Sequence, residues 1–163
     1  MQIILNLEEH GWLGISFQTP DGTEIEHSLS FLSDAVREMA EKGAMLTGVI
    51  QEVTMTLQTE PGEIRIVVSR QSPDVCHFRL YEMDDNFTTQ QTESGRLMLA
   101  TSVKTLRLLR ILHRELTKMK DLGEEEYERR WTYAFPAAAY DSIKQAIDEA
   151  KQACKLVIRK PTS

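Results

Sequence analysis

The spacing of the apolar residues changes near Val103 in this chain of 163 residues. Before it, as in residues 3–7 and 13–17, apolar side chains alternate with polar ones, which is typical of strands with one buried face. After it, apolar residues recur every three or four positions, which predicts helices. One helical segment interrupts the first part. This order of strands, helix, strands and helices predicts an α+β domain.

We expect a single antiparallel sheet of about six to seven strands in a meander, with three main helices packed mainly on one face. The segments TPDG, EPGE and QSPD separate the strands and have the residues of tight turns. A chain of this length can close one core without staples, so we expect one domain over 1–163. Its predicted elements are strands within 2–29, a helix over 31–43, strands within 48–102, helices over 103–122, 124–131 and 136–154, and a frayed tail over 160–163.

The charged residues are unevenly distributed. Residues 1–60 hold ten acidic and two basic residues, whereas residues 103–163 hold nine acidic and thirteen basic ones. The whole chain has a formal net charge of −6. Duplex nucleic acid needs a broad basic footprint, so this balance argues against nucleic acid as the main ligand and favours a basic partner.

Cysteine usage and the N-terminal segment bear on the compartment. The two cysteines, Cys76 and Cys154, suit a reducing compartment better than a disulfide framework. The segment MQIILNL lacks a basic region and has too few apolar residues for a signal peptide or a membrane span. We therefore expect a cytoplasmic protein with no membrane contact.

No motif in the sequence indicates a cofactor or a catalytic site. The cysteines and the four histidines lack zinc-site spacing, and no glycine-rich phosphate loop is present, so we expect no metal and no cofactor. Cys76 and His77 look like a nucleophile and a base, but adjacent strand residues point to opposite faces. We predict that Cys76 packs in the core, and we assign no catalytic residue.

The segment EEEYERRWTYAFP, residues 124–136, has the densest chemistry in the chain. Its first three glutamates suit the first turn of a short helix and its two arginines the last turn, because each then opposes the charge of the helix dipole. Large rings at a corner between helices usually close the edge of a core. We therefore interpret the segment as structural, with an exposed Trp131 and arginine interface as the alternative.

The predicted helix over 103–122 has a regular basic arc, formed by Lys104, Arg107, Arg110, Arg114 and Lys118. No aromatic residue lies within this arc to stack on bases, and long basic side chains cover apolar neighbours well. We favour a solvated helix face. A role in contacting phosphate or an acidic partner remains open.

Four segments together carry a resemblance to a known group of proteins: SFLSDAVREM, TEPGEIRIVVSR, FRLYEMDDNF and EEEYERRWTYAFPAAAYDSI. Their layout, over roughly residues 10–150, resembles a group of small bacterial proteins. Some of these lie beside polymorphic or contact-dependent toxins and look like immunity proteins. The resemblance implies a protein that binds another protein, and it transfers no catalytic residue.

The sequence thus predicts a non-enzymatic cytoplasmic protein-binding domain, an immunity protein that occludes a basic toxin domain. An acidic surface steers a basic partner toward it, and the expected recognition residues are acidic ones of the first third: Glu8, Glu9, Glu24, Glu26, Glu38 and Glu41. Two alternatives remain: a small enzyme that uses carboxylates or His77, and a regulator that binds nucleic acid through the basic helix over 104–118. The sequence does not determine the oligomeric state.

Overall fold

The computed structural model describes residues 1–85 and 90–158, and of residues 153–158 it describes the backbone only. The tail predicted over 160–163 and the side chain of Cys154 therefore lie outside the described part.

The described strands form two separate antiparallel sheets, so the prediction of a single sheet is wrong. The first sheet has the order β1-β2-β3, with β1 (Gln2–Leu7), β2 (Trp12–Gln18) and β3 (Glu24–Ser30). The second sheet has the order β4-β5-β6-β7, with β4 (Glu52–Gln58), β5 (Glu63–Arg70), β6 (Val75–Met83) and β7 (Arg96–Lys104).

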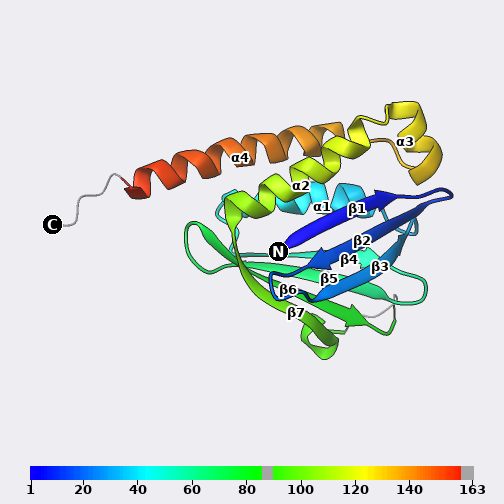
Figure 1. Cartoon of the computed structure of the whole chain (residues 1–163), viewed down its shortest axis with the longest axis horizontal. Coiled ribbons are helices and arrows are strands. Elements are labelled where there is room, and N and C mark those ends of the chain that lie inside the picture. Colours follow the sequence, from blue (N-terminus) through cyan, green and yellow to red (C-terminus); the bar gives the residue numbers. More distant parts are fainter. Residues whose placement is uncertain (86–89, 159–163) are drawn as a thin grey trace.

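The two sheets share one core. The rings of Phe17 on β2 and Phe78 on β6 lie 5.9 Å apart, and the buried residues of both sheets belong to the same apolar cluster. Figure 1 shows the first sheet lying over the second. Alternation indicates which face of a strand is buried, but it does not identify the neighbouring strand. The same sequence pattern therefore fits one large sheet or two stacked ones, and the helical connection after β3 starts a second layer.

The described part of the chain has four α-helices, one in each of the four predicted helical ranges. They are α1 (Ala35–Ala44), α2 (Thr105–Lys120), α3 (Glu124–Trp131) and α4 (Ala137–Ile158), with short 3-10 turns η1 (Met45–Thr47) and η2 (Thr92–Ser94). Helices α1, α2 and α4 pack together along one side of the sheets, where α1 contacts β4 and α2 contacts β1 and β7. Helix α3 adds a corner at one end (Figure 1).

Helix α1 begins at Ala35, later than the predicted start at residue 31. The hydroxyl of Ser30 accepts a hydrogen bond from the Leu32 N–H at 3.1 Å, which holds the chain in a turn. Asp34 then caps the helix by accepting from the Arg37 N–H at 3.1 Å. A side chain that bonds its own backbone competes with helix formation, so the helix starts only after this cap.

Side chains of α2 cover the free edge of β1. The buried carboxylate of Glu115 accepts from the Leu5 N–H at 3.0 Å, and Arg114 donates to the Ile3 carbonyl at 3.3 Å. Arg107 donates to the Met1 carbonyl, also at 3.3 Å. An edge strand presents unpaired backbone groups, and here helix side chains satisfy some of them in place of another strand.

The outer faces of the two sheets differ. On the second sheet a small cluster of Val67, Tyr81 and Met83 is buried, and Arg65 donates to the Gln90 carbonyl and the Thr92 hydroxyl at 2.8 and 3.2 Å. The segment around η2 therefore contacts that face. The outer face of the first sheet lies open to solvent.

Candidate binding surface on the outer face of the first sheet

The open face of the first sheet carries carboxylates and no cationic side chain of its own. In β1 and β3 the outward positions are exposed while the inward ones are mostly buried, as a two-faced strand requires. Residues 1–30 contain no lysine or arginine. Electrostatically this face therefore favours a cationic partner. We call it the acidic sheet face, and its residues are Ile4, Asn6, Glu8, Trp12, Gly14, Ser16, Glu24, Glu26 and Ser28.

Two predicted recognition residues, Glu8 and Glu26, line the same hollow on this face. The hollow has a volume of about 420 Å³, and small side chains such as Ser16 and Ser28 lie between the two glutamates. A Cβ atom placed on Gly14 would lie 3.2 Å from Oε1 of Glu8. The absence of a side chain at Gly14 thus leaves room for the Glu8 carboxylate over β2.

Glu24 belongs to the same face because it precedes Glu26 by two residues on β3. It is exposed, and its Oε1 accepts a hydrogen bond from Gln18 Nε2 at 2.6 Å across the β2–β3 pair. This bond fixes one carboxylate oxygen on the sheet surface. The other oxygen accepts no hydrogen bond from the described residues.

Apolar surface accompanies these carboxylates. Ile4 is 37% exposed, and Trp12, in line with Gly14 and Ser16 on β2, is half-buried. Charged rims around a few aromatic or aliphatic side chains are typical of protein interfaces. Trp12 and Ile4 were not among the site residues expected from the sequence. Their outward parity in the predicted strands was the available signal.

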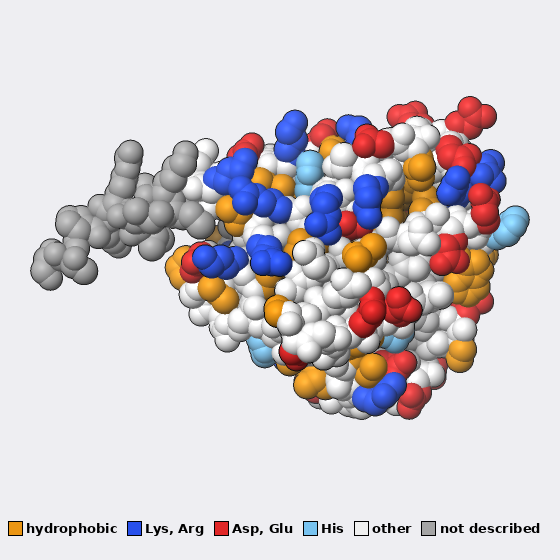
Figure 2. Space-filling view, viewed as in Figure 1, with side chains coloured by type: hydrophobic (Ala, Val, Ile, Leu, Met, Phe, Trp, Pro, Cys, Tyr) orange, Lys and Arg blue, Asp and Glu red, His pale blue; other side chains and the backbone are white. Residues whose placement is uncertain are grey.

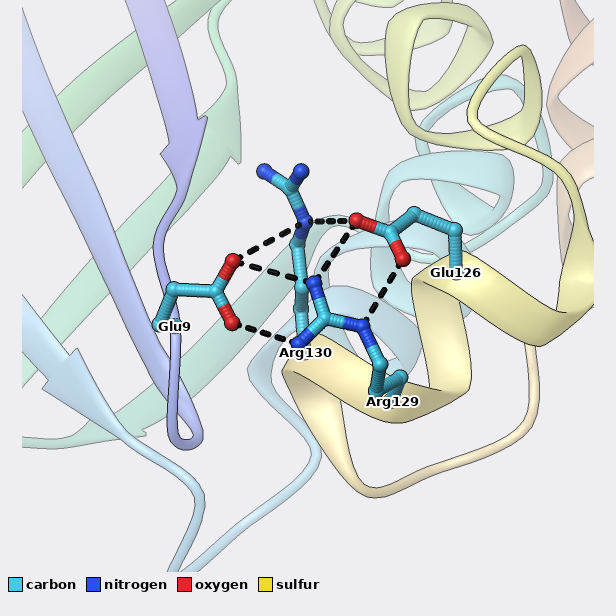
Figure 3. Close-up of polar contacts among 4 residues, drawn as sticks. All are labelled: Glu9, Glu126, Arg129 and Arg130. Atoms are coloured by element: carbon cyan, nitrogen blue, oxygen red, sulfur yellow. Dashed lines mark hydrogen bonds and ion pairs between the residues drawn. The ribbon is translucent and has the colours of Figure 1, made fainter.

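Glu9 lies instead in an ion-pair cluster with helix α3 (Figure 3). Arg129 donates to both Glu9 oxygens, at 2.7 and 3.0 Å, and to Glu126 at 2.8 Å. Arg130 donates to Glu126 at 2.7 Å. Hydrogen bonding from Arg129 lowers the pKa of Glu9, and the two arginines hold the pKa of Glu126 at about 2. The charge of Glu9 is therefore already neutralised within the molecule.

The corner that holds Glu9 is built from the segment of residues 124–136. Trp131 is fully buried, and its indole N–H donates to Asp34 Oδ1 at 3.0 Å. The carbonyl of Arg130 accepts from the Gly11 N–H at 2.7 Å, and the Tyr133 hydroxyl donates to the Phe31 carbonyl at 2.8 Å. The segment thus joins the β1–β2 turn to the start of α1. This geometry fits the structural interpretation and leaves Trp131 no surface for a partner.

The remaining two predicted recognition residues lie on α1. Glu41 is exposed and 3.9 Å from Arg37, and Glu38 is partly buried. Helix α1 packs against α2, α4 and β4. The structure therefore brings Glu8, Glu24 and Glu26 together on one face, while Glu9 belongs to the α3 corner and the other two to a different element.

Groups that sequence analysis considered for chemistry lie apart from this face. Cys76 is buried with its sulfur 3.0 Å from the Thr105 hydroxyl, whereas His77 occupies the alternate, partly exposed position of β6. Over residues 1–85 and 90–158, no three His, Cys, Asp or Glu side chains are grouped so that they could hold a metal ion.

Helix length and apolarity also bear on membrane contact. Within the described ranges, none of the helices combines the length and the apolar character needed to cross a membrane.

The chain was also compared with known proteins. Searches against protein-family models, curated proteins and solved structures found no match.

Proposed function

We propose that this chain is a non-enzymatic, cytoplasmic protein-binding domain that occludes a basic partner with its acidic sheet face. The observation that carries the proposal is the grouping of Glu8, Glu24 and Glu26 on an open face whose strands contain no lysine or arginine. Ile4 and Trp12 supply apolar contact area on the same face. Complementary charge accelerates encounter, and buried aromatic anchors supply much of the affinity.

The partner class that we propose is a bacterial toxin domain, which would make this chain an immunity protein. Enzymes that act on nucleic acid carry basic sites because their substrate is polyanionic. An acidic sheet face is suited to cover such a site. The resemblance to immunity-type proteins supports the same class.

The test measures association between this protein and the protein encoded by the adjacent reading frame. We expect the triple variant Glu8→Gln, Glu24→Gln and Glu26→Gln to slow association about tenfold or more at low salt. The difference should shrink as salt rises, because salt screens the steering field. Dissociation should change less, since exposed charges act mainly on encounter.

Two further variants locate the surface. Glu38→Gln with Glu41→Gln tests whether α1 belongs to the recognition surface. Glu93→Gln with Glu128→Gln changes exposed carboxylates on other elements and serves as the charge control. Equal slowing by the control pair would contradict a localised acidic face. Absence of any complex with the adjacent gene product would contradict the immunity proposal.

A further inference from the structure

A second charged surface lies at the edge of strand β1, beside helix α2. It is a groove of about 640 Å³ beside the first half of α2, larger than the hollow on the sheet. Figure 2 shows lysine and arginine side chains gathered over α2 and α4, whereas many acidic side chains lie toward the end with α3. We call it the basic groove, and four of its lining residues are cationic: Lys104, Arg107, Arg110 and Arg114.

Part of this positive charge has a structural role. Arg107 and Arg114 donate to the carbonyls of Met1 and Ile3 and so cover the edge of β1. Arg114 also pairs with Glu115 at 2.8 Å. Arg107 and Arg114 therefore have partners within the protein and need no ligand.

The other two cations of the groove have no structural role of this kind. Lys104 and Arg110 are exposed, and neither side chain has a hydrogen bond or an ion pair with any residue that the structure describes. Two exposed cations that line one groove without internal partners favour an anionic ligand. The guanidinium of Arg110 is also suited to a carboxylate, since its fork of N–H donors can bind both oxygens.

The groove also has apolar lining. Ile111 is 5% exposed, and Leu106 is partly buried against the main core. A ligand with only anionic groups would leave the exposed part of Leu106 in contact with water. A ligand with apolar groups between its anionic ones can pair with the cations and cover the apolar lining together.

These features favour a protein segment over nucleic acid. No aromatic residue lines the groove, so bases have nothing to stack on. Asp74 is among the lining residues, and its negative charge would repel a continuous phosphate backbone. A peptide can place its acidic side chains away from Asp74, because its charges are discrete and separated.

We propose that the basic groove binds an acidic protein segment with apolar side chains between its carboxylates. Lys104 and Arg110 pair with the carboxylates, and Leu106 contacts the apolar side chains. This inference is independent of the proposed function, because it concerns a different surface and a partner of opposite charge.

The first experiment uses a fluorescein-labelled peptide that alternates aspartate and leucine, with anisotropy as the readout at low salt. We expect saturable binding that the double variant Lys104→Gln with Arg110→Gln weakens at least tenfold, since it removes two charge-assisted contacts. The matched control is Lys144→Gln with Lys151→Gln on α4, which makes the same change in net charge. It should bind within twofold of the parent.

A second pair of measurements tests the apolar lining and the ligand class. Leu106→Ala should weaken the aspartate–leucine peptide severalfold and leave a peptide of aspartate and glycine unchanged. Circular dichroism confirms that each variant is folded. Equal losses in the groove and control variants would overturn the proposal. So would no binding of the peptide by the parent, or tighter binding of a single-stranded oligonucleotide at the same salt.

Discussion

At the scale of single residues, the two tryptophans of this chain occupy opposite environments. Trp131 is fully buried and donates to Asp34, which also caps α1, so one carboxylate links two helices. Trp12 lies half-buried on the acidic sheet face and makes no side-chain hydrogen bond within the described part of the chain. Trp131 therefore stabilises the fold, while Trp12 is available to contact a partner.

Substitution of each tryptophan separates these roles. Trp131→Ala should lower the free energy of unfolding by about 3–5 kcal/mol, as is usual for large aromatic deletions in a core. Trp12→Ala should cost clearly less stability and instead weaken binding of the basic partner. Urea unfolding followed by circular dichroism measures the first effect, and titration with the partner measures the second. Equal stability of the two variants would contradict this assignment.

At the scale of elements, the contact between α2 and β1 joins parts of the chain that are 110 residues apart. Hydrogen bonds from the Leu5 N–H, Lys118 and Arg114 outweigh the effect of burial and lower the pKa of Glu115. The carboxylate therefore stays ionised while it accepts from a strand. Arg114 and Lys118 form ion pairs with this carboxylate and balance its charge.

Removal of the Glu115 acceptor should destabilise the protein. Glu115→Leu leaves the buried Leu5 N–H without its partner, and we expect a loss of about 1–3 kcal/mol in the free energy of unfolding. Glu115→Gln keeps an acceptor and should cost less. Urea unfolding of the three proteins at equal concentration gives the comparison. Equal losses in the free energy of unfolding for Glu115→Leu and Glu115→Gln would show that the hydrogen bond to the Leu5 N–H does not stabilise the fold.

The predicted helix over 103–122 and the observed α2 show what sequence reasoning can reach. Three- and four-residue spacing predicted the helix and its basic arc, because that pattern depends only on local geometry. It did not show that Arg107 and Arg114 turn toward β1, since that contact depends on the stacking of sheets. Strand faces were likewise predictable from alternation, whereas strand neighbours were not.

In the candidate site, too, local features were predictable from the sequence, whereas contacts between distant residues were not. Glu24 and Glu26 are two residues apart in the sequence, which places them on one side of a strand, and both are exposed on β3. Nothing local could show that Glu9 pairs with Arg129, which lies 120 residues later. The six glutamates expected on one surface therefore lie in three places.

At the scale of the whole molecule, two partly buried histidines lie in different layers. Burial lowers the pKa of His27 on β3, although the charge of Glu82 opposes this shift. Burial, with Lys144 and Lys120 nearby, also lowers the pKa of His113 on α2, whose ring stacks on Tyr140 at 4.8 Å. In the unfolded chain both imidazoles return to about 6.5.

Stability should therefore fall as the solution is acidified. Below about pH 6.5 the unfolded chain binds more protons at these histidines than the folded one, so the free energy of unfolding decreases toward their lower folded pKa values. Urea midpoints at pH 7.5 and pH 5.5 measure this slope. His113→Gln should reduce it, whereas His10→Gln, on an exposed turn, controls for the loss of an imidazole. A steeper slope in His113→Gln would contradict the assignment.

Side chains of α2 can cover the edge of β1 only after α2 has been synthesised, which happens well after β1. A ribosome adds about 5–20 residues per second, so Glu115 follows Leu5 by roughly ten seconds. During that interval the first sheet can form its hairpins, but its outer edge has no cap. Unpaired strand edges attract other strands, and contacts distant in sequence form slowly. The first thirty residues, acidic and free of lysine and arginine, repel one another between nascent chains until α2 arrives.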